Sequence, residues 1–230
     1  MAGFSPVLPL AWGLPHRSAE RLLAGLTVIV DGSGPGIPDI TDSLRSVGIG
    51  RVRSGPYAAE AAIWALGDDE FPDAWGEEDA GMPPAAAVVF VRRTPLPWVM
   101  AAPWARDGVT HLQVHLDGHR AQIGPLVIPG VSSCIRCHDL TRRTAAGPRG
   151  IPPGTSGRAP DRATTLLAAA LTAVTLRGAL LGDHGLAGVS SEIETGRPEV
   201  RHRHWPRHVA CPCAAETVPR WAVAHWTMGA

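Results

Sequence analysis

The four cysteines of this chain are the residues whose type and spacing most directly indicate chemistry. A Cys-x-x-Cys pair and a Cys-x-Cys pair can each direct both sulfurs toward one ion, and zinc favours four such ligands in a tetrahedron. The spacing therefore predicts a closed four-sulfur structural site that joins two remote segments and has no open position for catalysis. Its predicted ligands, in the stretches "SSCIRCHDL" and "HVACPCAA", are Cys134, Cys137, Cys211 and Cys213.

Other interpretations of the cysteines stay open at this point. A redox Cys-x-x-Cys motif would explain the first pair but would leave the second unexplained. Inert buried thiols and an iron–sulfur cluster are further alternatives. His138 follows the first pair, and His202, His204 and His208 precede the second. A histidine could replace one sulfur, but we expect these side chains to lie at the surface or beside the ligands.

A glycine-rich turn is the second candidate site. It follows a β-branched run at residues 27–30 and opens a pattern of apolar residues at helical spacing. Free backbone N–H groups and the helix dipole can bind phosphate at such a turn, and an arginine nearby could bind phosphate through its forked donors. The candidate cofactor-binding residues are therefore Gly32, Gly34, Gly36 and Arg45.

The turn nevertheless departs from the dinucleotide fingerprint GxGxxG. Ile37 stands in the third glycine place, and Pro35 and Pro38 each remove an N–H donor. The next predicted strand ends in "RVRSGPY", without the carboxylate that would hold a ribose. These departures favour a turn that only packs a strand against a helix.

Composition excludes several classes of function. Hydrophobic residues make up 45% of the chain, which is typical of a globular protein, and the formal net charge of zero argues against a nucleic-acid binder. The sequence contains no lysine and no asparagine, so no lysine can serve as a phosphate ligand or a general base. The apolar run that begins at Thr164 contains Arg177 and is better explained by a packed helix than by a membrane span. We expect a cytoplasmic protein, where paired cysteines more often bind metal.

The predicted elements that position these sites form an α/β fold with a Rossmann-like mixed sheet. Strand and helix signals alternate in the first part, and antiparallel strands dominate the second. Predicted boundaries are an N-terminal arm at 1–26, a Rossmann-like half at 27–125 and a zinc-bearing half of the same domain at 126–230. The predicted strands lie at 27–30, after the stretch 48–52 ("GIGRV") that leads into a second strand, at 87–91, in a hairpin around Asp117-Gly118 within 110–130, and in "GVSSEIET" and "EVRHRHW". The predicted helices lie at 37–47, 98–106 and 161–181, and a loop is predicted at 141–160.

These features together resemble a known family. The glycine turn, "VGIGRV", "GPLVIPGVSSCIRCHDL" and "HVACPCAA" resemble the ThiF/MoeB/HesA adenylyltransferase superfamily, whose fold the ubiquitin-activating enzymes share. The chain is most similar to actinobacterial ThiF-like proteins that bind leader peptides or partner a cyclodehydratase in the synthesis of azoline-containing peptides. The resemblance spans about residues 25–215. It implies a zinc site on the four cysteines, a homodimer, and binding of ATP and magnesium for the activation of a carboxylate as its adenylate.

The chain departs from active members of that family. They use an acidic residue after the second strand, an Asn/Arg/Gln motif beyond it, and a lysine near the phosphates, whereas this sequence has neither lysine nor asparagine. If all four thiols bind zinc, none remains as a nucleophile. We therefore expect no catalytic residue, zinc as the cofactor in place of ATP and magnesium, and a scaffold that binds a precursor peptide or a partner biosynthetic enzyme. The alternatives are an active ATP-dependent adenylyltransferase that uses Arg45, Arg51 or Arg53, and a dinucleotide-dependent oxidoreductase.

Overall fold

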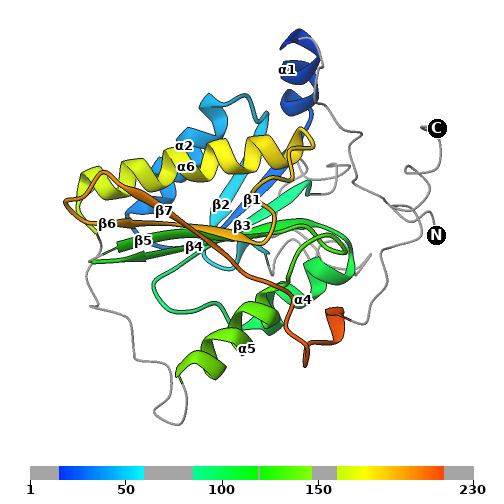
Figure 1. Ribbon diagram of the computed structural model, residues 1–230. Helices are drawn as coiled ribbons and strands as arrows, with labels where there is room; N and C mark the ends of the chain where they lie inside the picture. The colour runs from blue at the N-terminus through cyan, green and yellow to red at the C-terminus, as the bar shows by residue number, and fades with distance from the viewer. Residues whose placement is uncertain (1–15, 60–84, 119, 147–159, 215–230) are drawn as a thin grey trace.

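A seven-stranded sheet lies between two layers of helices in the computed structural model, which describes residues 16–59, 85–118, 120–146 and 160–214. Helices α2 (Gly36–Ser46) and α6 (Arg162–Leu180) cover one face, and helices α4 (Trp98–Arg106) and α5 (Ile135–Ala146) cover the other (Figure 1). The other described helices are α1 (His16–Ala24) and a short 3-10 turn, η3 (Pro212–Ala214). The α/β prediction is confirmed.

The sheet is mixed, as predicted. Its strands lie in the order β2-β1-β3-β4-β5-β6-β7. The first four pair in parallel and the rest pair antiparallel, so the change of direction falls at β4. The strands are β1 (Thr27–Gly32), β2 (Arg51–Gly55), β3 (Ala87–Arg92), β4 (Thr110–Asp117), β5 (Arg120–Val127), β6 (Val189–Glu194) and β7 (Val200–His204).

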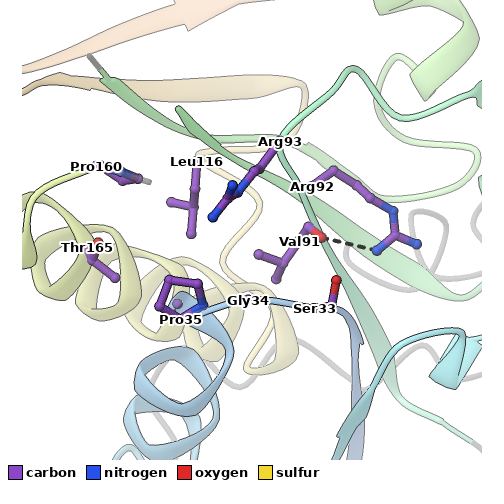
Figure 2. A pocket seen from close by; sticks show the side chains of 10 residues that line it. Ser33, Gly34, Pro35, Val91, Arg92, Arg93, Leu116, Pro160 and Thr165 are labelled. Atoms are coloured by element: carbon purple, nitrogen blue, oxygen red, sulfur yellow. Dashed lines mark hydrogen bonds between the residues drawn. The ribbon is translucent and has the colours of Figure 1, made fainter. Parts of the chain in front are cut away.

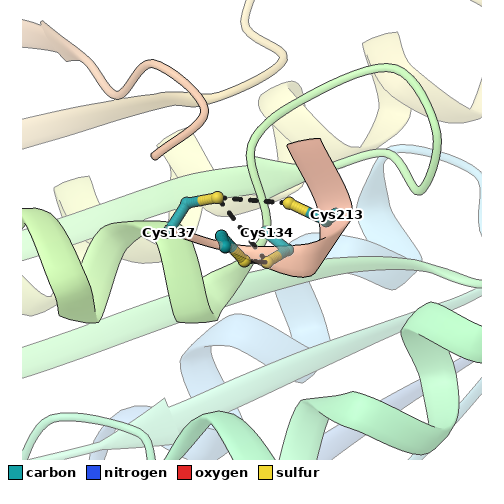
Figure 3. Close-up of side chains that lie close together, drawn as sticks. Cys134, Cys137 and Cys213 are labelled. Atoms are coloured by element: carbon teal, nitrogen blue, oxygen red, sulfur yellow. Dashed lines mark hydrogen bonds between the residues drawn. The ribbon is translucent and has the colours of Figure 1, made fainter. Parts of the chain in front are cut away.

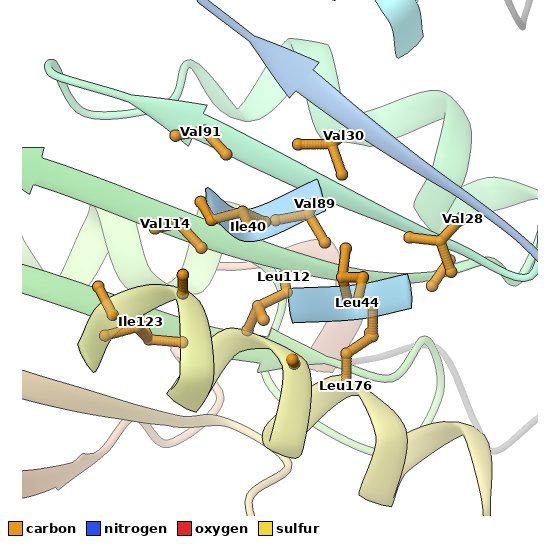
Figure 4. Close-up of a cluster of buried hydrophobic side chains, with 14 of the residues drawn as sticks. Val28, Val30, Ile40, Leu44, Val89, Val91, Leu112, Val114, Ile123 and Leu176 are labelled. Carbon is orange, nitrogen blue, oxygen red and sulfur yellow. The ribbon is translucent and has the colours of Figure 1, made fainter. Parts of the chain in front are cut away.

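Two hydrophobic clusters hold the layers together. The larger one lies between the sheet and helices α2 and α6, where Ile40, Leu44 and Leu176 contact valines of β1, β3 and β4 (Figure 4). The smaller one lies on the opposite face and includes Phe90 and Trp104. Both faces of the parallel strands β1 and β3 are buried, which explains why these two strands consist mostly of consecutive apolar residues.

Helix α6 belongs to this core. It is long and apolar enough, by length and composition, to cross a membrane. It packs instead against α2 and the sheet, with Ala169, Ala173 and Leu176 buried. Its small side chains allow close approach to the sheet, and Asp161 caps its first turn by accepting a hydrogen bond from the Thr164 backbone N–H at 3.0 Å. The helix predicted over residues 161–181 is confirmed.

Two helices were not predicted. Helix α1 lies inside the 1–26 arm and buries Ala19 and Leu23, which are four residues apart on one helical face. Helix α5 buries Ile135 and His138 in its first turn and continues to Ala146, where a loop was predicted from residue 141. An i,i+4 ion pair between Arg143 and Asp139 at 3.1 Å lies in this continuation. The remainder of that predicted loop lies outside the described residues. The domain boundaries stay a prediction.

Candidate functional site

The four cysteines lie together although the two pairs are far apart in the sequence, with Cys211 lying 77 positions after Cys134. Cys134 immediately precedes α5 and Cys137 lies in its first turn, while Cys211 and Cys213 flank the start of η3 (Figure 3). Their sulfur atoms all lie within 4.8 Å of one another. The predicted juxtaposition of Cys134, Cys137, Cys211 and Cys213 is therefore confirmed.

The arrangement of the sulfurs fits a metal ion better than a disulfide. The distances are 3.9 Å between Cys134 and Cys137, 3.6 Å between Cys134 and Cys211, and 3.2 Å between Cys137 and Cys213. A disulfide requires about 2.05 Å. Four sulfurs around one ion at about 2.3 Å would lie about 3.8 Å apart if tetrahedral. The observed distances bracket that value, so the four thiols could hold a metal ion.

Backbone and side-chain contacts keep the two cysteine segments in register. The Ser133 hydroxyl donates a hydrogen bond to the Trp205 carbonyl at 2.6 Å. The Arg207 guanidinium donates to the Gly130 carbonyl at 2.6 Å and to the Cys213 carbonyl at 3.4 Å. The Ser133–Trp205 and Arg207–Gly130 bonds join the two segments, and the Arg207–Cys213 bond braces the second segment internally, so the protein scaffold itself positions the sulfurs.

The electrostatics of the thiols differ within the cluster. Burial raises the pKa of Cys134 to about 11 and also raises the pKa of Cys213. Burial acts in the same direction at Cys137, but the backbone N–H of His208, 3.3 Å from its sulfur, and contacts with the other cysteines outweigh it and lower that pKa. Cys137 is thus the ligand best supported by its neighbours as a thiolate.

The nearby histidines occupy other roles. His138 is buried and packs edge-on against Trp205 with ring centroids 4.1 Å apart. His202 Nδ1 lies 3.0 Å from the Ser191 hydroxyl. His208 Nδ1 accepts a hydrogen bond from the backbone N–H of Ala210. The sulfur cluster itself contains no histidine, which agrees with the expectation that they lie around the ligands.

The glycine turn joins β1 to α2, as predicted. A side chain at Gly32 would collide with the Val91 carbonyl, and one at Gly36 would collide with Leu116. Gly34 has φ +116, a backbone conformation that favours glycine. Two of the three glycines therefore allow close packing of the turn against β3 and β4, which is a structural reason for their presence.

The hollow beside the turn is small. It is lined by Gly34, Pro35, Arg93 and Thr165 among others, and Figure 2 shows the Arg93 side chain directed into it. Its cavity volume is about 20 Å³, which is room for about one water molecule, whereas small-molecule sites typically enclose at least ~300 Å³. The described residues therefore enclose no cavity of nucleotide size beside the turn.

Arg45 does not lie with the three glycines. It occupies the last turn of α2, about 13 Å along the axis from Gly36 at a rise of ~1.5 Å per residue. Its guanidinium forms an exposed ion pair with Asp42 at 3.3 Å and donates to the Val52 carbonyl at 3.4 Å. Arg45 thus contacts the edge of β2, at the end of the helix away from the turn.

An ion pair with a buried carboxylate, at the carboxyl ends of β1 and β3 beside the glycine turn, was missed in the sequence analysis. Asp31, fully buried at the end of β1, lies 2.6 Å from the Arg92 guanidinium and accepts the backbone N–H of Ala59 at 3.0 Å. Arg92 also donates to the Asp31 and Val91 carbonyls. The sequence did hold a signal, since an aspartate follows the apolar run of β1 and an arginine ends that of β3. The carboxyl ends of neighbouring parallel strands lie side by side, so these two charged residues could have been expected to pair.

Comparisons with known proteins give a structural likeness only. No protein-family model and no curated protein matches the sequence. A heterocyclase solved in complex with substrate and cofactor superposes with a TM-score of 0.59 and 16% identity, covering 85% of this chain and 26% of the other. The heterocyclase TruD gives 0.56 and 16% over 87% of this chain and 29% of its own. E. coli MccB, solved with SeMet MccA, gives 0.56 and 15% over 87% and 69%.

The fold is shared with heterocyclases and MccB. At these identities the likeness establishes the architecture and nothing finer. The chain spans about a quarter of the length of the heterocyclases and 69% of that of MccB. MccB has also been solved with ATP, in a structure that gives a TM-score of 0.55 at 16% identity.

Proposed function

We propose that this chain is a zinc-stabilised scaffold of the ThiF-like type, which binds a precursor peptide or a partner enzyme during maturation of an azoline-type peptide. The observation that carries the proposal is the contrast between a complete ligand set on the cysteines and a glycine turn with a cavity of about 20 Å³. The likeness to heterocyclases and to an MccB solved with MccA supports a peptide or enzyme as the partner. We further propose a cytoplasmic homodimer.

The chemistry of the donor set favours zinc. Four thiolates suit zinc or an iron–sulfur cluster, and zinc tolerates a closed tetrahedral site with no redox role. When bound, the ion would contribute folding free energy by holding the segment of Cys134 and Cys137 to that of Cys211 and Cys213. The chain's own part is to orient the sulfurs and to exclude solvent from Cys137 and Cys211, which are buried.

Elemental analysis and calorimetry test the two halves of this proposal. Purified protein is expected to contain one zinc per chain, without iron or acid-labile sulfide. Titration with ATP and magnesium is expected to show no binding at concentrations up to about 1 mM, a range that covers typical enzyme substrates. Micromolar ATP binding together with adenylate formation on a peptide carboxylate would overturn the scaffold assignment.

A second candidate function is an active adenylyltransferase. One observation favours it, namely that Arg93 lies beside the glycine turn, where a forked donor could bind phosphate. ATP-dependent pyrophosphate exchange with carboxylate-bearing peptides is the direct assay. Exchange that is lost in Arg93→Ala and retained in Arg45→Ala would support this alternative, because Arg93 lines the hollow beside the turn and Arg45 does not. Absence of exchange with the wild-type chain would count against it.

A further inference from the structure

Among the described residues, strand β7 forms one end of the sheet and has no strand paired to its outer side. It is the last strand of the described order and pairs only with β6. The backbone N–H of Trp205 bonds to the Gly188 carbonyl at 2.8 Å. Because antiparallel strands alternate between inward and outward groups, Arg203 and Arg201 also bond toward β6. The N–H and C=O groups of His202 and His204 therefore point away from the sheet.

The side chains along this edge are basic and exposed. Arg201 and Arg203 lie on the same face of β7 as Trp205, since residues two apart share a face. The Arg203 guanidinium lies 4.0 Å from the centroid of the Trp205 ring, and Arg201 forms a 3.1 Å ion pair with Glu194. Residues 201–204 are all exposed. An extended segment beside β7 would thus meet two guanidiniums spaced by two residues.

The opposite edge of the sheet differs. In β2 the Arg51 N–H bonds to the Leu26 carbonyl, so the groups of the next residue, Val52, point outward. The Val52 carbonyl accepts a hydrogen bond from Arg45 at 3.4 Å. The chain therefore covers its β2 edge with its own side chain, a common way of blocking strand addition. Among the described residues, no side chain bonds the outward groups of His202 or His204.

A second copy of this chain is a poor occupant of the β7 edge. Two β7 strands pairing antiparallel would place arginines and histidines opposite one another, and like charges directly opposite destabilise a sheet. An acidic partner strand would be attracted instead. Charge complementarity therefore favours an extended peptide with carboxylates at alternate positions, one opposite Arg203 and one that competes with Glu194 for Arg201.

We propose that β7 binds an acidic extended peptide segment as an eighth strand, with backbone hydrogen bonds to His202 and His204 and with carboxylates two residues apart facing Arg203 and Arg201. The inference deepens the proposed function and rests on it in one respect, that the partner is a peptide. Main-chain bonds would give affinity, and the arginine spacing would give specificity and a dependence on salt.

Backbone-blocked peptides give the sharpest test. The probe is a fluorescent, end-blocked nine-residue peptide of alternating Glu and Val, with two analogues that are N-methylated on its odd or on its even residues. Only one set of amides in a strand faces a single edge, so one analogue is expected to bind the wild-type protein like the parent and the other at least about tenfold more weakly. Equal binding of both analogues, or no binding of the parent, would overturn the proposal.

Charge reversal supplies a second, independent measurement. Arg201→Glu with Arg203→Glu is expected to weaken the parent peptide about tenfold or more, at low salt, by fluorescence anisotropy. The control, Arg51→Glu with Arg106→Glu, makes the same change in net charge at exposed positions away from β7 and is expected to leave affinity unchanged. Equal weakening by both pairs would mean that net charge alone attracts the peptide, and would contradict the edge site.

Hydrogen exchange locates the bound strand without any substitution. The outward amides of His202 and His204 are expected to exchange at least about tenfold more slowly with the peptide bound. Protection from exchange elsewhere but not at β7 would contradict the proposed β7 site and leave the scaffold function intact. Adenylate formation would instead contradict the scaffold function, and it would not affect the interpretation of protection at β7.

Discussion

The cysteine cluster and the glycine turn are both built where a strand gives way to a helix, at α5 and α2 respectively, yet their donor atoms have different fates. At the cluster, four sulfurs converge within 4.8 Å and their loops are tied together by Ser133 and Arg207. At the turn, the Leu116 side chain packs against Gly36. Next to the turn, Asp31 forms an ion pair with Arg92. The cysteines thus bring side-chain ligands together, whereas the glycines allow the turn to pack closely against its neighbours.

Metal removal should lower the free energy of unfolding more than any other change. If it does not, the cysteine cluster is no more important for stability than the glycine turn. Cys137→Ser, or prolonged chelation of the wild-type chain, is expected to release the metal and to destabilise the domain by several kcal/mol, since structural zinc in small motifs contributes ~10 kcal/mol or more. Metal content and urea unfolding check this. Val209→Ser, an exposed change two residues from Cys211, is the matched control and should keep both metal and stability.

The ion pair at the glycine-turn edge should give the next largest effect. Asp31→Ala leaves the Arg92 guanidinium without its buried partner, and breaking such a pair costs about 3–5 kcal/mol. Asp42→Ala breaks the exposed pair with Arg45 and should cost less than about 1 kcal/mol. Thermal or urea unfolding of the two variants compares them directly. Equal losses would show that the buried pair carries no special stabilisation.

The stability of the fold to acid should depend on His111 in β4. Burial lowers the pKa of His111 from 6.5 to about 4. Because the unfolded chain binds this proton more readily, the stabilising contribution is full above pH 6.5 and is lost as the pH falls toward 4, by about 3 kcal/mol. Urea unfolding from pH 7 to 4.5 should therefore fall less steeply in His111→Phe than in the wild type. Parallel curves would contradict this account.

The smallest effect should come from Arg45. Arg45→Ala removes an exposed ion pair and one bond to the Val52 carbonyl, which should cost under about 1 kcal/mol in urea unfolding. Because Arg45 lies at the far end of α2, calorimetry with ATP should give the same result for this variant as for the wild type, which is no binding under the proposed function. If the wild type does bind ATP and this variant does not, Arg45 belongs to the nucleotide site.

The sequence predicted the features that depend on local pattern. The helix at Trp98–Arg106, the hairpin on either side of Asp117-Gly118 and the cysteine pairing all follow from periodicity, turn chemistry or ligand spacing. Helix α5 was missed because its buried face includes His138, which packs against Trp205 in the remote segment after β7. The Asp31–Arg92 pair likewise required knowledge of which strands are neighbours. Contacts between remote segments leave no periodic trace in either segment.

Trp205 stands directly after β7 and before the second cysteine pair, with its ring against His138 and its indole nitrogen bonded to Ser190. Trp205 therefore connects strand β7 to the segment that carries Cys211 and Cys213. Chelating the ion would slacken this link, so we expect the free margin of the sheet to fray first. A bound metal would then control whether strand β7 is ordered enough to bind a peptide.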